Sequence, residues 1–226
     1  MKKRYVLIPA YKPEKTLLSF IQALEERNLR VIVVNDGSGE EYLPLFQKME
    51  DNTGVKLIQL EQNRGKGAAL KAGLSYLQTL DGNFQIITVD ADGQHSLQDT
   101  LFLLEEGEEH ENCLLLGSRT QYGSSPLRSR LGNAITRKVF SLTTGVPIRD
   151  TQTGLRCFGK ELIPDLLAIP GNRYEYEMNV LLEFARAGIP ILEYPIETIY
   201  LNDNAGSHFD TVKDSFRIYG QILKFI

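Results

Sequence analysis

The chain has 226 residues, 42% of them hydrophobic and 24% charged, with a formal net charge of −4. This composition is that of a globular domain with a substantial core, and the negative charge argues against general nucleic-acid binding. No apolar run approaches the roughly 18 residues of a membrane span, and the first residues lead into a strand-like run, so no signal peptide is expected. Cys113 and Cys157 lack the spacing of a metal site and are predicted to be free core thiols in a reducing compartment.

The first half of the chain alternates short apolar runs with amphipathic patterns. Strands are predicted at 5–10, 30–36, 55–60 and 84–90, and helices at 14–28, 40–50 and 66–80. Alternation of this kind predicts a parallel sheet covered by helices. Ligands of such sheets bind where the carboxyl ends of the strands open onto loops. Each of these strands is followed by polar or turn residues, so a site assembled from strand ends is expected.

The second half of the chain is less regular. Strands are predicted at 113–119, 155–158 and 189–200, and helices at 128–143, 160–168 and 174–188. Pro195 predicts that the last strand is an edge strand, and Gly188 is the expected C-cap of the helix before it. We predict one α/β domain over residues 1–210. An amphipathic helix is predicted over 211–226, which either packs on the domain or lies on a membrane surface.

The stretch "VDADGQH" carries the strongest chemical signal. Asp90 and Asp92 end a buried strand, and like charges this close raise each other's pKa unless a positive charge lies between them. The D-x-D spacing lets both carboxylates reach one divalent cation, with Gln94 as a candidate third oxygen ligand. We expect the positive charge to arrive with the metal and substrate, and Gly93 to allow the turn. The alternative is two solvated loop acids, with Ser96 capping the next helix.

Two further stretches suit an anionic ligand. "NRGKGAALKAG" places glycines around Lys66 at the start of a predicted helix, where backbone N–H groups and an ammonium can meet phosphates. The segment from Asn112 to Arg149 has six basic residues and no acidic residue. It is either a solvated basic face or a site for an anionic partner.

In this order, "PAY", "VNDGS", "NRGKGAAL", "DADGQ", "GSR", "DTQTGLR" and "E-x-P-I" resemble the family 2 glycosyltransferases with the GT-A fold. Within that family the chain is most similar to the polyprenyl-phosphate glycosyltransferases of the dolichyl-phosphate mannose synthase type. The match runs over roughly residues 5 to 200. The resemblance implies a Rossmann-like, mostly parallel central sheet flanked by helices, and transfer of a sugar from UDP- or GDP-sugar to a polyprenyl phosphate.

The resemblance also assigns roles to individual positions. The implied residues for the nucleotide-sugar are Pro9, Ala10, Tyr11, Asp36, Gly37, Ser38, Lys66 and Asp90. The implied ligands of Mg²⁺ or Mn²⁺ are Asp90, Asp92 and Gln94. The implied contacts of the acceptor phosphate are Arg119, Arg130, Ser207 and His208. Asp92, Arg119, Arg130 and Asp150 are the candidate catalytic residues.

The chemistry of the acceptor leaves alternatives open. A lipid phosphate is already anionic, so arginines need only position it for attack opposite the leaving group, which predicts inversion at the anomeric carbon. A saccharide or protein hydroxyl would need a base, for which Asp150 is the candidate, unless Asp150 caps a turn or pairs with an arginine such as Arg156. A non-catalytic nucleotide-sugar-binding module is a further alternative. We expect a cytoplasmic protein, peripheral at the inner face of the membrane, with or without a separate integral-membrane partner.

Overall fold

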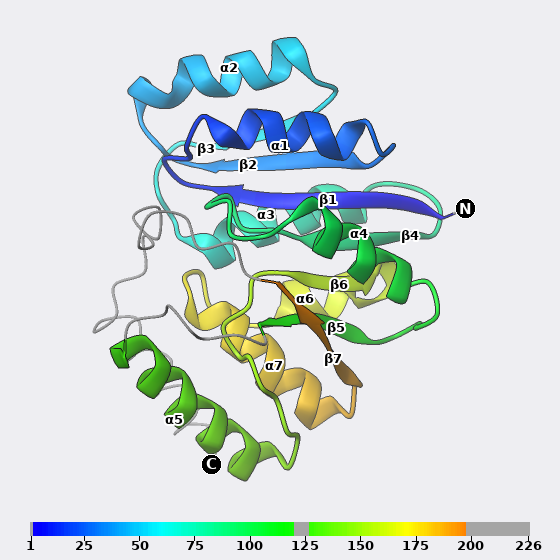
Figure 1. The fold of residues 1–226 in the computed structure, drawn as a ribbon. Coiled ribbons are helices and arrows are strands. Elements are labelled where there is room, and N and C mark those ends of the chain that lie inside the picture. Colours follow the sequence, from blue (N-terminus) through cyan, green and yellow to red (C-terminus); the bar gives the residue numbers. More distant parts are fainter. Residues whose placement is uncertain (1, 120–126, 198–226) are drawn as a thin grey trace.

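The computed structural model describes residues 2–119 and 127–197, and of residues 127–135 the backbone alone (Figure 1). Within these residues, seven strands form one sheet in the order β3-β2-β1-β4-β6-β5-β7. The strands are β1 (Lys3–Ala10), β2 (Arg30–Asp36), β3 (Lys56–Leu60), β4 (Phe84–Thr88), β5 (Leu114–Arg119), β6 (Arg156–Gly159) and β7 (Ile191–Ile196). β6 runs antiparallel to β4 and β5, and the other paired strands are parallel. The prediction of a mostly parallel sheet is confirmed.

Helices cover both faces of the sheet because side chains of each buried strand alternate between two apolar cores. In β1, Tyr5 and Leu7 join one core, whereas Val6 and Ile8 join the other. The second core is completed by α1 (Thr16–Glu25), α2 (Leu43–Asn52) and α4 (Leu97–Glu106). The first is completed by α3 (Lys66–Gln78), α5 (Leu127–Thr144), α6 (Ile163–Ala168) and α7 (Glu175–Ala187). Two short 3₁₀ helices, η1 (Glu40–Tyr42) and η2 (Lys160–Leu162), precede α2 and α6.

The local signals in the sequence have the expected structural roles. β7 is an edge strand and contains Pro195. Gly188 ends α7 in the left-handed conformation, and the Ser96 hydroxyl accepts a hydrogen bond from the Asp99 N–H at the start of α4. The direction of β6 is a feature that the sequence pattern did not indicate. Because β6 is antiparallel, residues 150–154 before it lie at the same edge of the sheet as the carboxyl ends of the parallel strands.

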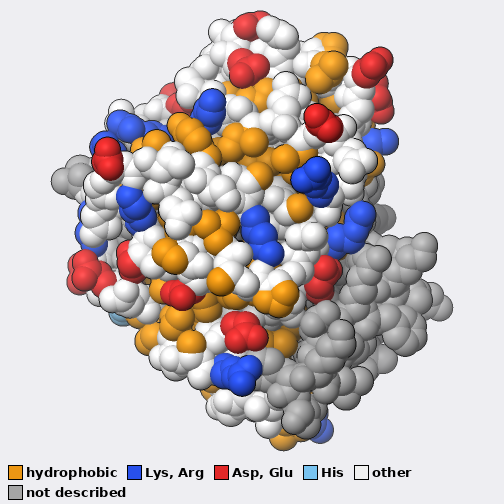
Figure 2. Space-filling view, turned by 180° about the vertical axis from the view of Figure 1, so that it is seen from behind, with side chains coloured by type: hydrophobic (Ala, Val, Ile, Leu, Met, Phe, Trp, Pro, Cys, Tyr) orange, Lys and Arg blue, Asp and Glu red, His pale blue; other side chains and the backbone are white. Residues whose placement is uncertain are grey.

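Surface and covalent features agree with a reduced globular domain. Cys113 and Cys157 are free thiols, as predicted. Over the described ranges, no helix is long and apolar enough to cross a membrane. On the face turned to the reader in Figure 2, acidic and basic side chains are interspersed with hydrophobic ones. The predicted helix over 211–226 lies outside the described residues.

Candidate functional site

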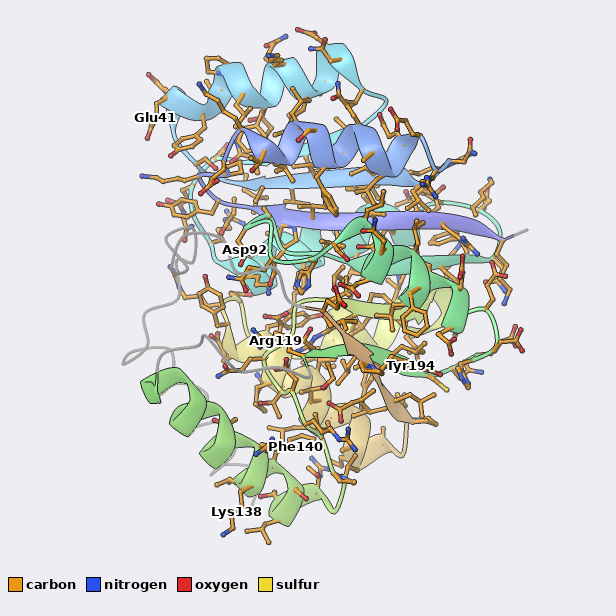
Figure 3. The ribbon with its side chains drawn as sticks, viewed as in Figure 1. Glu41, Asp92, Arg119, Lys138, Phe140 and Tyr194 are labelled. Atoms are coloured by element: carbon orange, nitrogen blue, oxygen red, sulfur yellow. The ribbon has the colours of Figure 1, made fainter. Side chains whose placement is uncertain are left out.

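The predicted site residues that the structure describes lie at one edge of the sheet, where β1, β2, β4 and β5 end. Figure 3 shows Asp92 and Arg119 at this edge, on the same side of the molecule. Pro9 and Ala10 end β1, and Asp36 ends β2. The parallel register of β1, β2 and β4 brings these ends together. The described candidate residues therefore lie together, as expected of a site assembled from strand ends, and their roles stay predictions.

The loops after β1 and β2 are joined by hydrogen bonds. The backbone N–H of Lys12 donates to the Ser38 hydroxyl over 2.9 Å, and the Ser38 N–H donates to the Asn35 side chain over 3.0 Å. Asp36 accepts 2.8 Å hydrogen bonds from the N–H groups of Arg64 and Gly65. Burial raises the pKa of Asp36, although these hydrogen bonds oppose the shift. Asp36 therefore fixes the loop before α3, in addition to the nucleotide contact that the resemblance implies for it.

Gly37 is required where the β2 loop meets the β3 loop. Its φ is +62°, and a Cβ atom there would lie 2.2 Å from the backbone carbon of Gln62. We expect Gly37→Ala to lower the free energy of unfolding by about 3 kcal/mol, because it adds both backbone strain and a steric clash. The matched control is Gly82→Ala, since Gly82 also has a positive φ but a Cβ there meets nothing within 4 Å. Urea unfolding would measure both, and equal losses would contradict the clash.

Lys66 is held between two carboxylates. Its ammonium lies 2.7 Å from Asp90 Oδ1 and 2.8 Å from Glu177 Oε2. Burial lowers the pKa of Lys66, but the two carboxylates outweigh it and hold the pKa above its ordinary value. The expectation that the positive charge beside Asp90 arrives only with metal and substrate is corrected, because Lys66 already supplies one. The phosphate-binding role of Lys66 stays a prediction.

Arg156 is the second cation of this cluster. Its Nε lies 3.8 Å from Glu177 Oε1, and its guanidinium donates to the Thr153 and Glu177 carbonyl oxygens over 2.9 Å. The His95 Nε2 lies 3.9 Å from Asp90 Oδ2. Burial raises the pKa of Asp90, but the charge of Lys66 and the nearby His95 imidazole reverse the shift. Asp90 is therefore a firmly ionised, fixed carboxylate.

Asp92 has a different environment, although it is only two residues away. Burial and the charge of Asp90 raise the pKa of Asp92. Its Oδ1 accepts a 3.1 Å hydrogen bond from the Gln94 N–H, and Gly93 adopts the positive φ expected of the turn. A carboxylate destabilised by a like charge favours a nearby cation, so Asp92 is the acid of this pair that a bound cation would stabilise most.

The residues present fit Mg²⁺ or Mn²⁺. The donor set of Asp90, Asp92 and Gln94 offers oxygen atoms, which these hard cations prefer. Among the described residues, no group of three or more His, Cys, Asp or Glu side chains could hold a metal ion. Mg²⁺ sites commonly combine one or two carboxylates with substrate phosphates. This donor set therefore fits a cation that is shared with a diphosphate.

Asp150 forms a bidentate ion pair with Arg119. The carboxylate accepts from Arg119 Nε over 2.5 Å and from Nη2 over 2.9 Å, and the Asp150 side chain is fully buried. Burial raises the pKa of Asp150, but the hydrogen bonds and charge of Arg119 outweigh it and lower the pKa. Asp150 also caps a turn, since its Oδ1 accepts a 3.1 Å hydrogen bond from the Gln152 N–H. Both structural alternatives from the sequence are therefore confirmed, and the arginine partner is Arg119, not Arg156. A carboxylate with a depressed pKa is a weak general base.

A groove beside this pair is lined by both basic and apolar side chains. It has a volume of about 1040 Å³ and lies between the end of α5, the loop before β6, β5 and β7. We call it the α5 groove. Its basic side chains are Arg119, Arg137, Lys138 and Arg149. Its apolar lining includes Leu142, which is 78% exposed. Figure 3 shows Lys138 on α5 and Arg119 at the end of β5.

Some predicted residues cannot be placed at the site. Arg130 belongs to α5, but its side chain is outside the described part. Ser207 and His208 also lie outside the described residues. Conversely, sequence reasoning gave Glu177 no role. Its only signal was a charged residue within the otherwise apolar face of the predicted helix 174–188.

Comparisons with known proteins agree with this architecture. Residues 5–164 match the family model described as glycosyl transferase family 2. A UDP-N-acetylglucosamine–dolichyl-phosphate N-acetylglucosaminyltransferase from Methanococcus voltae is 28% identical over 97% of this chain and 94% of that protein. A dolichyl-phosphate beta-glucosyltransferase from Dictyostelium discoideum is 25% identical over 97% of this chain and 72% of that protein.

Solved structures share the fold. The crystal structure of glucosyl-3-phosphoglycerate synthase from Mycobacterium tuberculosis, in complex with Mn²⁺, UDP-glucose and phosphoglyceric acid, superposes with a TM-score of 0.70. It is 19% identical, and the match covers 99% of this chain and 79% of that chain. The predicted GT-A fold is confirmed.

Proposed function

The chain belongs to glycosyl transferase family 2, and we propose that this glycosyltransferase moves a sugar from a UDP- or GDP-sugar to a polyprenyl phosphate. The family assignment removes the alternative of a non-catalytic module. Relatives that match nearly the whole chain are named as dolichyl-phosphate glycosyltransferases, which supports the proposed acceptor.

The Arg119–Asp150 ion pair is the observation that carries the choice of acceptor. Transfer to a hydroxyl requires a base, and Asp150 was the candidate. Its carboxylate is fully buried and occupied by two hydrogen bonds from Arg119. A phosphate acceptor needs no base, because its oxygen is already anionic. The pair therefore supports a phosphate acceptor, with Asp150 positioning Arg119.

The α5 groove supports an acceptor with both charged and apolar parts. Its basic side chains suit a phosphate, since guanidinium and ammonium groups form charge-assisted hydrogen bonds with phosphate oxygens. Its apolar lining, including the exposed Leu142, suits the first isoprene units of a lipid. We propose that Arg119 and Arg130 contact the acceptor phosphate, together with Ser207 and His208.

The donor is proposed to lie across the ends of β1, β2 and β4. Pro9, Ala10, Tyr11 and the loop of Asp36, Gly37 and Ser38 would contact the nucleoside, and Lys66 the diphosphate end. Asp90, Asp92 and Gln94 would hold Mg²⁺ or Mn²⁺, which the Mn²⁺ in the complex of the Mycobacterium tuberculosis enzyme supports. The bound cation would neutralise the charge that develops on the diphosphate leaving group. Arg119 would orient the acceptor oxygen for attack from the opposite side, with inversion.

Direct detection of the product tests this proposal. Purified protein is incubated with labelled UDP- and GDP-sugars, Mn²⁺ or Mg²⁺, and undecaprenyl or dolichyl phosphate, and label in the lipid phase is measured. We expect lipid-linked sugar that requires the cation, and we expect none with the corresponding dephosphorylated polyprenol. Transfer to a sugar hydroxyl without any lipid product would overturn the proposed acceptor. Asp150→Asn cannot separate these acceptors, because it also releases Arg119.

We also propose where the reaction takes place. A polyprenyl phosphate is embedded in a membrane and a nucleotide-sugar is water-soluble, so the enzyme must work at a membrane surface. We place it at the cytoplasmic face, bound peripherally or through a separate integral-membrane partner. Flotation of the protein with vesicles that contain polyprenyl phosphate would test direct binding, and a protein that stays at the bottom of the gradient would contradict peripheral binding and leave attachment through a partner.

A further inference from the structure

Glu177 lies outside every motif that suggested the site, yet it is built into it. The residue is in the first turn of α7 and is only 7% exposed. One carboxylate oxygen is 2.8 Å from the Lys66 ammonium, and the other is 3.8 Å from the Arg156 guanidinium. Lys66 in turn contacts Asp90 at 2.7 Å. Glu177 is therefore two contacts away from a proposed metal ligand.

The starts of α3 and α7 are fixed against each other, which holds this contact in place. The N–H of Ala68 donates to the carbonyl oxygen of Asn172 over 2.9 Å. A Cβ atom at Gly67 would lie 2.6 Å from Tyr176 Cβ, so the two helix starts touch at a glycine. The backbone of Lys66 is therefore held beside the first turn of α7, within reach of Glu177.

The balance of charges gives Glu177 a specific effect on cation binding. Apart from the His95 imidazole, the cluster contains three carboxylates, Asp90, Asp92 and Glu177, and two cations, Lys66 and Arg156. One net negative charge is therefore left for an incoming divalent cation. Without the charge of Glu177 the cluster would be neutral. Asp90 would then be the one carboxylate paired with Lys66, and the Lys66 ammonium would compete with the incoming divalent cation for it.

We propose that Glu177 is a positioning residue of the reaction. It shares the Lys66 ammonium with Asp90, and so keeps the Asp90–Asp92 pair negative enough to bind a divalent cation with the donor diphosphate. The inference rests on the proposed function, since it assumes that Asp90 and Asp92 are metal ligands. It adds a residue on α7, remote in sequence, that sets the affinity of the site for the cation.

The test is a titration of the nucleotide-free protein with Mn²⁺, followed by the electron paramagnetic resonance signal of the free ion, so that the proposed contact of Lys66 with the diphosphate does not enter the comparison. We expect Glu177→Gln to raise the Kd for Mn²⁺ by about tenfold, because one negative charge is lost in a poorly screened environment. The double variant Lys66→Met/Glu177→Gln removes one charge of each sign. We expect its Kd to return to within about threefold of the wild-type value by the same argument.

The controls separate charge from folding. Glu183→Gln changes a partly exposed acid on the same helix and should leave the Kd unchanged. Circular dichroism checks that each variant is folded. If Glu177 only supported the fold, the double variant would bind Mn²⁺ no better than Glu177→Gln, and that result would overturn the inference.

The same titration, together with the product assay, distinguishes failure of the role of Glu177 from failure of the proposed function. If the wild-type protein forms lipid-linked sugar and binds Mn²⁺, but Glu177→Gln binds it equally well, the inference fails and the proposed function stands. If the wild-type protein binds no Mn²⁺, the inference fails, and the assay for lipid-linked sugar alone decides whether the proposed function fails with it.

Discussion

Replacing Asp92 with asparagine is expected to lower kcat/KM for sugar transfer on the order of 10³-fold, the scale on which removal of a group that stabilises developing charge acts. Asp92 is the acid whose pKa is raised by burial and by the charge of Asp90. Within the part of the chain that the structure describes, no cation contacts Asp92 as closely as Lys66 contacts Asp90. An asparagine keeps the shape of the side chain but removes the charge that a divalent cation would balance.

Two measurements separate this effect from a loss of structure. Initial rates of formation of lipid-linked sugar give kcat/KM, and Mn²⁺ titration gives metal binding. Both should fall together in Asp92→Asn. Asp51→Asn, an exposed change on α2, should alter neither. An Asp92→Asn enzyme that keeps full activity would show that Asp92 is not a metal ligand.

Asp150→Asn is expected to lower the free energy of unfolding near neutral pH by about 2 kcal/mol or more, because it breaks a buried, bidentate ion pair. The Asp150 side chain is fully buried and the Arg119 side chain is 22% exposed. The guanidinium would keep at most one good hydrogen bond to an asparagine oxygen. Urea unfolding of the two proteins at pH 7 measures the difference.

The difference in the free energy of unfolding between wild type and Asp150→Asn is expected to depend on pH in a definite direction. Arg119 holds the pKa of Asp150 below its ordinary value despite burial, so in the acidic range the unfolded state binds more protons than the folded state. The stabilisation by the pair is therefore present above the ordinary carboxyl pKa and is lost as the pH falls through the folded pKa. The gap between wild type and Asp150→Asn should narrow on acidification. Asp81→Asn, in an exposed loop, is the control, and a gap that widened would contradict the pairing.

The half of the site formed by the parallel strands was predictable from the sequence. Period and composition indicate β1 to β4, and parallel strands bring their carboxyl ends to one edge. The order of the motifs then placed Pro9, Asp36 and Asp92 together. These signals are local, because each motif directly follows the strand that positions it.

The remaining contacts join residues that are far apart in the sequence, and no local pattern predicts such contacts. Lys66 and Glu177 meet because α3 and α7 start side by side. A single glutamate in an amphipathic helix does not indicate which residue it contacts. Arg119 and Asp150 meet because β6 runs antiparallel, and its four residues give no signal of direction. For this reason the sequence left open whether Asp150 was a base or the partner of an arginine.

The cluster around Lys66 also bears on the order of events as the chain is synthesised. Lys66 and Asp90 are made well before Glu177, which forms the second ion pair of Lys66. Contacts of such long sequence separation form slowly, because the intervening chain must be ordered first. A nascent chain that ends before α7 would hold the Lys66 ammonium without its second carboxylate. The full cation affinity that we propose for the site should therefore be reached only when α7 has docked.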